Sequence, residues 1–189
     1  PAQSGVPILS LDRVSHVYAD GTRALTDLTL EVHRRDYLAV LGQNGAGKSN
    51  FLDALHFVRD ALANSLDNAI NERGGLNEVR RRSSGHPTHF GVRLEFRLRD
   101  GRDGLYAFDI GAMASGGFEV QHEKCVIEGV GKGPFFRIEK GHLLDSSEPA
   151  FPAITSDRLA LVAASGFTAF RPVFDALTAM GFYNLNPKL

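Results

Sequence analysis

A glycine-rich octapeptide, GQNGAGKS at residues 42–49, constrains the fold of this chain more than any other feature. It satisfies the spacing G-x-x-x-x-G-K-[ST], which becomes meaningful when a strand precedes it and a helix follows it. Here the apolar run YLAVLG comes before the loop, as a buried parallel strand would, and helical periodicity begins after it. The sequence therefore predicts an α/β fold with a phosphate-binding loop.

The residue types in this loop suit a nucleoside triphosphate, and we expect ATP with Mg²⁺. Glycines let the backbone curl around the anion, so that N–H groups converge at the N-terminus of a helix. Lys48 would reach the β- and γ-phosphates, and the Ser49 hydroxyl would ligate Mg²⁺. The other residues predicted to bind the nucleotide are Gly42, Asn44, Gly45, Ala46, Gly47 and Asn50. The alternative is a glycine-rich turn before a helix that happens to begin with Lys-Ser.

Apolar periodicity on both sides of the loop predicts a hairpin and a helix. Residues 8–15 and 25–32 alternate apolar and polar residues, as the two strands of a hairpin do. From Lys48 onward one apolar stripe recurs at helical spacing. Its members are Phe51, Ala54, Leu55, Val58 and Leu62. We expect this helix to fade after residue 63 and to end at Gly74 and Gly75, before a polar loop.

The second half of the chain predicts an antiparallel β subdomain followed by a helix. The first strand places five apolar residues on one face, namely Phe90, Val92, Leu94, Phe96 and Leu98. Further strands are predicted over residues 105–112 and 118–128, and a hairpin over 135–145. A helical stripe then comprises Phe170, Val173, Phe174, Leu177 and Met180. Pro172 is tolerable in the first turn of this helix, and Gly181 would end it.

Composition favours a globular protein of the cytoplasm. The chain is 43% hydrophobic and 23% charged, and it has no apolar run long enough to span a membrane. Its first residues show no secretory signal, and its one cysteine, Cys125, cannot form an internal disulfide. We interpret Cys125 as a strand residue. Four other side chains carry no argument beyond surface or helix-dipole roles: Asp53, Arg59, Arg73 and Glu123.

Arginines gather in the middle of the chain. Residues 73–102 contain eight arginines against three acidic residues. Arg80, Arg81 and Arg82 are consecutive and are the first candidate contacts for DNA or another polyanion. Arg93, Arg97 and Arg99, on the polar face of a nearby predicted strand, would extend this surface. The alternative is a solvated surface whose arginines pair with nearby acids such as Glu78 and Glu95. Contact with DNA would be non-specific and would weaken steeply with salt.

The stretch NGAGKSNFLDAL resembles ATP-binding cassette (ABC) ATPases, and more closely their RecF/SMC-like branch. In that branch an asparagine commonly follows the loop serine, as Asn50 does, whereas transporter cassettes usually carry threonine there. The longer stretches FLDALHFVRDALANSLDNAINERGGLNEVRRRSSGHPTHFGVRLEF and DRLALVAASGFTAFRPVFDALTAMGFYNLNP resemble bacterial AAA-type ATPases with an ABC-like head, which are relatives of the OLD nucleases. The resemblance extends from about Leu9 to Pro187.

This resemblance implies an ABC-ATPase-like P-loop lobe with an antiparallel β subdomain. Strands, phosphate loop and helix would occupy residues up to about 70, the β subdomain about 88–145, and a further helix about 167–181. Tyr18 would stack on adenine, although a tyrosine packed at the end of the hairpin is the alternative. The family's glutamine loop has only two loose candidates here, Gln43 and Gln121, and the spacing of Gln121 is not diagnostic.

Two further motifs of such ATPases, an LSGGQ-like signature and a Walker B strand ending in Asp-Glu, are missing from the sequence. Asp109 in LYAFDIG lacks the following glutamate and is rejected as a Walker B residue. The resemblance thus implies the N-terminal half of an ATPase head. Its partner would be a second head, most simply in a homodimer, or a C-terminal half. DNA or an effector protein would be a further partner.

The resemblance implies coupling of Mg-ATP binding and hydrolysis to a conformational change in a DNA-linked or defence process. Two alternatives stay open. One is an ATP-gated interaction module without hydrolysis, which the missing Walker B motif favours. The other is the nucleotide-binding subunit of an ABC transporter, against which Asn50 counts.

Overall fold

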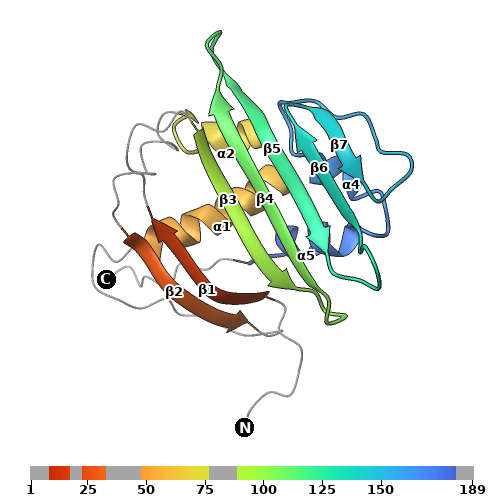
Figure 1. Ribbon diagram of the computed structural model, residues 1–189. Helices are drawn as coiled ribbons and strands as arrows, with labels where there is room; N and C mark the ends of the chain where they lie inside the picture. The colour runs from red at the N-terminus through yellow and green to blue at the C-terminus, as the bar shows by residue number, and fades with distance from the viewer. Residues whose placement is uncertain (1–8, 18–22, 33–47, 77–88, 182–189) are drawn as a thin grey trace.

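A five-stranded antiparallel sheet, in the order β3-β4-β5-β6-β7, dominates the computed structural model, which describes residues 9–17, 23–32, 48–76 and 89–181 (Figure 1). Each of the first four strands pairs with the strand that follows it in the chain. The strands are β3 His89–Arg97, β4 Asp103–Ala112, β5 Phe118–Ile127, β6 Phe135–Glu139 and β7 His142–Ser146. The predicted antiparallel β subdomain is confirmed.

Alternation of apolar and polar residues decides which face of this sheet is buried. On β3, Leu94 and Phe96 are buried while Arg93 and Glu95 are exposed, as the sequence predicts. On β5 the alternation is interrupted, because Asp109 pairs with His122 but Ile110 pairs with Val120. Gln121 is therefore the extra residue of a β-bulge, and it shifts the phase of the strand.

A separate two-stranded antiparallel sheet comprises β1 Leu9–Val17 and β2 Arg23–Val32. These bounds confirm the hairpin predicted from the alternation near the N-terminus. Figure 1 shows the hairpin beside the β3 edge of the larger sheet, and β1 contacts β3. Within the hairpin, Leu11 of β1 pairs with Leu30 of β2, and Val14 pairs with Leu28.

Helices cover one face of the five-stranded sheet (Figure 1). They are α1 Lys48–Ala63, α2 Leu66–Asn71, α4 Ala160–Ala164 and α5 Arg171–Thr178. The Phe57 ring of α1 lies edge-on to Phe90, with ring centroids 5.4 Å apart. Phe170, which precedes α5, meets Phe136 of β6 in the same geometry at 5.2 Å. Such aromatic pairs join the helices to the buried face of the sheet.

Three predictions about helices need correction. Helix α1 ends at Ala63, where the sequence predicts fading, but a separate helix, α2, follows it, because Ser65 is an N-cap whose Oγ accepts a hydrogen bond from Asn68 N at 3.0 Å. Ala54, predicted in the buried stripe, is exposed, whereas Leu55, Val58 and Leu62 are buried. The final helix spans Arg171–Thr178 rather than 167–181, and the short helix α4 was not predicted.

Candidate phosphate-binding site at the start of α1

Helix α1 begins at Lys48, so that Lys48, Ser49 and Asn50 are its first three residues. The predicted helix after the phosphate loop is therefore confirmed, whereas the roles of these three side chains stay predictions. The first turn of α1 carries no acidic residue. Its N–H groups and the positive end of the helix dipole thus have no carboxylate competing with a bound phosphate. The helix start fits the anion that the sequence predicts.

Several predicted site residues lie outside the residues that the structure describes. Within the loop these are Gly42, Gln43, Asn44, Gly45, Ala46 and Gly47, and the strand predicted before it falls in the same gap. Tyr18 and the arginines Arg80, Arg81 and Arg82 lie in two further gaps. Their proposed contacts with nucleotide and nucleic acid stay predictions from the sequence.

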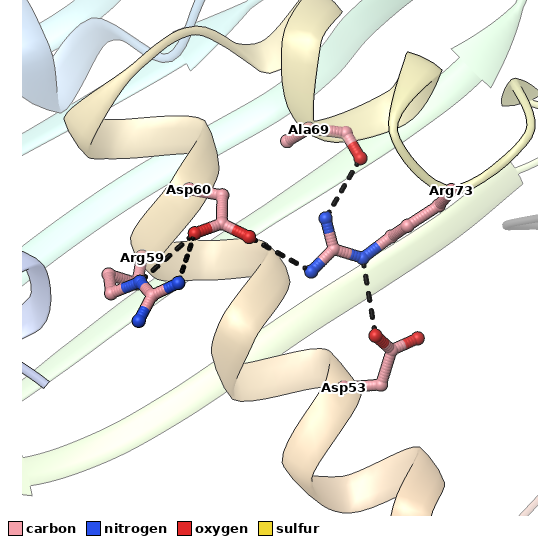
Figure 2. A network of polar contacts seen from close by, with 5 residues as sticks. All are labelled: Asp53, Arg59, Asp60, Ala69 and Arg73. Atoms are coloured by element: carbon pink, nitrogen blue, oxygen red, sulfur yellow. Dashed lines mark hydrogen bonds and ion pairs between the residues drawn. The ribbon is translucent and has the colours of Figure 1, made fainter. Parts of the chain in front are cut away.

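A network of charged side chains connects α1 with the chain that follows α2 (Figure 2). The Arg73 guanidinium donates to Asp60 Oδ2 at 3.1 Å and to Asp53 Oδ1 at 3.3 Å. Asp60 also accepts two hydrogen bonds on Oδ1 from Arg59, at 3.0 and 2.7 Å. Asp53 and Asp60 are seven residues apart, two helical turns, and therefore face the same side of α1.

Arg73 is largely buried, since only 10% of its side chain is exposed. Besides the two carboxylates, it donates from Nη1 to the carbonyl oxygen of Ala69 at 2.9 Å, near the end of α2. Its guanidinium also lies over the Phe57 ring, 5.3 Å from the centroid. A buried arginine needs such partners, because a charge removed from water is costly unless it is paired and hydrogen-bonded.

The two arginines around Asp60 determine its protonation. Burial of Asp60 favours the neutral acid, but the hydrogen bonds and positive charges of Arg59 and Arg73 outweigh burial and hold the pKa of Asp60 below its usual value. On the same helix, burial and then the charge of Arg59 lower the pKa of His56. Asp60 is therefore an anion near neutral pH, and the network contains complementary charges.

A second buried charge, Glu123 of β5, lies among the side chains that face the helices. Glu123 is only 2% exposed, and its Oε1 accepts a hydrogen bond from the Tyr106 hydroxyl at 2.9 Å. Backbone N–H groups of Ala160 and Leu161 donate to its two oxygens at 2.6 and 2.9 Å. Leu159, the N-cap residue of α4, offers no side-chain cap. Glu123 thus caps α4 from a neighbouring strand.

Burial and hydrogen bonding act on Glu123 in opposite directions. Burial favours the neutral acid, and it raises the pKa of Glu123 to about 7 although three donors favour the ionised form. Burial and the adjacent Glu123 charge also raise the pKa of the Tyr106 hydroxyl. The protonation of Glu123 therefore changes near neutral pH.

Four of the five described arginines of the basic region are paired with acids: Arg73, Arg93, Arg97 and Arg102. Arg93 donates to Glu95, as the alternative interpretation predicted, with Nη2 2.6 Å from Oε1. Other pairs join Arg97 to Asp103 and Arg102 to Asp100. Cys125 lies on β5, which confirms it as a strand residue. Its burial raises the pKa of the thiol, so that the thiolate is disfavoured.

The two remaining candidates from the sequence lie in the antiparallel sheet. Gln121, the loose candidate for a glutamine loop, occupies the bulge of β5 and donates from Nε2 to Glu119 Oε2 at 2.8 Å. Asp109, rejected as a Walker B residue, lies on β4, with Oδ2 3.6 Å from His122 Nδ1. Both side chains thus lie on strands of the sheet and not on α1, where the phosphate-binding residues are predicted.

Of the two largely buried charged residues Glu123 and Arg73, the sequence contains a usable signal for Glu123. Glu123 interrupts an otherwise apolar set of inward positions on β5, which also includes Cys125 and Ile127. A lone acid at such a position indicates a buried hydrogen-bonded carboxylate. For Arg73 the indication is weaker, because its acidic partners lie 13 and 20 residues away in the chain.

Comparison with known families agrees with the loop and the helix. A family model described as "AAA domain, putative AbiEii toxin, Type IV TA system" matches residues 38–159. This range is well over half of the chain and includes the phosphate loop, α1 and the whole five-stranded sheet. No solved structure matches the chain. None of the helices in the described residues is long and apolar enough to cross a membrane.

Curated relatives match over shorter stretches. A phosphonates import ATP-binding protein of Lactococcus lactis is 32% identical over 59 residues, which is 31% of this chain and 24% of that protein. A phosphite import ATP-binding protein of Stutzerimonas stutzeri is 34% identical over 80 residues, covering 41% and 29%. A cobalt import ATP-binding protein of Rhodobacter capsulatus is 32% identical over 105 residues, covering 53% and 34%. The chain thus spans about a quarter to a third of these relatives.

Proposed function

This chain belongs to the AAA domain family of P-loop ATPases, and we propose that it is the ATP-binding lobe of a RecF/SMC-like ATPase. The observation that carries this proposal is the sequence GQNGAGKS, whose last two residues, Lys48 and Ser49, begin helix α1. In the complete protein, Mg-ATP binding and hydrolysis would drive a conformational change in a DNA-linked or defence process. A cytoplasmic location and the extent of the lobe over residues 1–189 are part of the same proposal.

The proposed binding site uses residues at the end of the loop and the start of α1. Lys48 would contact the β- and γ-phosphates, Ser49 would ligate Mg²⁺, and the loop N–H groups would hold the remaining phosphate oxygens. Bound Mg²⁺ would neutralise part of the phosphate charge. Because the first turn of α1 lacks acids, the protein itself adds no negative charge at this point.

Catalysis would need more than this site. Phosphoryl transfer depends on positioning of water, metal and compensating charge, and the sequence shows no Walker B strand or signature segment to supply them. We infer that the missing groups come from a C-terminal half and from a second head across a homodimer. DNA or an effector protein would then respond to the opening and closing of the two heads.

Two other functions use the same site. The import proteins among the relatives favour the nucleotide-binding subunit of an ABC transporter. An ATP-gated interaction module would bind Mg-ATP without turning it over. A membrane partner recovered with the native protein would support the transporter subunit, whereas a functional response that survives loss of hydrolysis would support the module.

We expect the chain to bind Mg-ATP with a dissociation constant (Kd) of about 1 to 100 μM, as one phosphate-binding site with few other contacts allows. Fluorescence anisotropy of a labelled ATP analogue, competed with unlabelled ATP and repeated with EDTA, measures the affinity and its metal dependence. Turnover by the chain alone should be slow. Absence of specific binding would contradict the proposed function, and rapid turnover would contradict the need for further catalytic parts.

The arginine segment gives a separate prediction about nucleic acid. If Arg80, Arg81 and Arg82 contact phosphates, replacing all three with alanine should weaken binding of labelled duplex DNA and reduce its dependence on salt by about two to three phosphate contacts. The matched control replaces Arg93, Arg97 and Arg102, which are paired with acids. A DNA affinity that is equal at low and moderate salt would exclude the contact.

A further inference from the structure

We propose that Arg73 is a positioning residue for the phosphate-binding end of α1, which it holds in place through Asp53. This inference rests on the proposed nucleotide-binding function and assigns a second segment of the chain to that site. Asp53 follows Ser49 by four residues, one turn of helix. A tether at Asp53 therefore acts close to the residues expected to contact phosphate.

The start of α1 has few apolar anchors among its described side chains. Leu52 is 36% exposed and Ala54 is exposed, whereas Leu55 is the first described side chain of the helix that is buried in the core. Among the described side chains of α1, packing into the core thus begins at Leu55. The ion pair between Asp53 and Arg73 extends this attachment toward Ser49.

The geometry of Arg73 suits it to hold the helix in one position. Its three nitrogens donate to Asp53, to Asp60 and to the carbonyl oxygen of Ala69. Because the guanidinium is planar and rigid, contacts at two points of α1 and one point of α2 fix both the distance and the rotation between the helices. Lysine has the same charge but lacks the fork that spans these partners.

These contacts also distinguish Arg73 from the arginines that are expected to bind a polyanion. Each guanidinium nitrogen of Arg73 has a protein acceptor, and the side chain is only 10% exposed. Gly74 and Gly75 follow with positive φ angles of 87° and 89°, so the chain turns away from α2 immediately after Arg73. Arg73 thus binds groups of the protein itself rather than a polyanion.

The test compares Mg-ATP affinity with stability in the variants Asp53→Asn and Arg73→Lys. Asp53 is 38% exposed and its hydrogen bond is long, at 3.3 Å, so Asp53→Asn should fold and keep a urea midpoint near that of the wild type. We expect the Kd for Mg-ATP to rise about twofold to fivefold in both variants, because a partly exposed ion pair contributes up to about 1 kcal/mol to holding α1 in its binding position. Asp53→Glu retains the carboxylate and should restore most of the affinity.

Asp175→Asn is the matched control. It removes the carboxylate partner of Arg171 on α5, an exposed ion pair of 2.7 Å, and should leave the Kd unchanged. If Asp53→Asn and Arg73→Lys match this control while Lys48→Ala loses binding, the positioning role is overturned and the proposed function stands. If the wild type does not bind Mg-ATP, both are overturned. A Kd that changes only in proportion to the unfolded fraction also overturns the positioning role.

Discussion

Replacing Lys48 with alanine should weaken Mg-ATP binding about a hundredfold, because contacts between a cation and two phosphates contribute about 3 kcal/mol. The variant should remain folded. Lys48 is the first residue of α1, where a positive side chain opposes the helix dipole, so its removal should leave stability unchanged or raise it by a few tenths of a kcal/mol. Anisotropy titrations and urea unfolding curves of the same samples measure both effects.

Lys124→Ala is the control for this change. Lys124 is an exposed lysine on β5, in the antiparallel sheet rather than on α1, and its loss should leave Mg-ATP affinity as it was. A Lys48→Ala variant that binds within about threefold of the wild type would contradict the phosphate-loop assignment, since that corresponds to well under 1 kcal/mol. Loss of binding together with unfolding would also fail to support it.

Replacing Glu123 with alanine should lower the free energy of unfolding by about 4 kcal/mol, a large effect for a single substitution. The change leaves the Tyr106 hydroxyl and the N–H groups of Ala160 and Leu161 without their acceptor in the protein interior. It also creates a cavity beside the start of α4. Glu139→Ala, on the exposed face of β6, should change stability by less than about 0.5 kcal/mol.

The same carboxyl predicts how stability depends on pH. The pKa of Glu123 is about 7 in the folded chain and 4.5 as the reference for the unfolded chain, so the folded state holds an extra proton between these values. Its contribution is fully present below pH 4.5, declines as pH rises, and is lost above pH 7, a change of up to about 3 kcal/mol. Acid lowers stability through Asp60, whose depressed pKa has the opposite effect.

The variant Glu123→Gln isolates this effect, because glutamine does not titrate. Unfolding free energies of the variant and the wild type are measured in urea from pH 4.5 to 8. The change with pH in the difference between them is the contribution of this one carboxyl. The wild type should lose stability relative to Glu123→Gln as pH rises. A difference between the two that is constant over this range would contradict the raised pKa of Glu123.

Local periodicity predicted those parts of the fold in which one face of an element is buried. On β3 and at the residue after it, the alternation placed Leu94, Phe96 and Leu98 correctly inside, because the side chains of a strand alternate between the two faces. The helical stripe through Leu55 and Val58 was equally informative. Such patterns depend only on neighbours within one element, and they are therefore visible in the sequence.

Other parts of the fold depend on partners distant in the chain. The bulge at Gln121 changes the phase of β5, and no residue type in FEVQHEKCVI fixes its position. Helix α4 has only five residues, too few for a helical stripe, and its cap comes from Glu123. Phe57 lies outside the predicted stripe of α1, yet it is buried because it packs against β3 and β4.

The candidate site was predictable to a similar extent. The spacing GxxxxGKS predicted a helix that begins near Lys48, and the structure places the first residue of α1 there. The tether between Asp53 and Arg73 was not predictable, because it depends on where the chain returns after α2. Spacing in sequence thus indicated the phosphate-binding chemistry, while the attachment of α1 required the three-dimensional arrangement.

The chain-order arrangement of the five-stranded sheet has a consequence for the order of folding. From β4 onward, each strand can pair with the strand synthesised just before it, so the sheet can grow by successive local hairpins with small entropic cost. Helix α1 is synthesised before this sheet exists, and its contact with α5 joins residues more than a hundred positions apart. The apolar side of α1 therefore stays exposed during synthesis, open to aggregation or to binding by a chaperone, until the sheet and α5 have been synthesised.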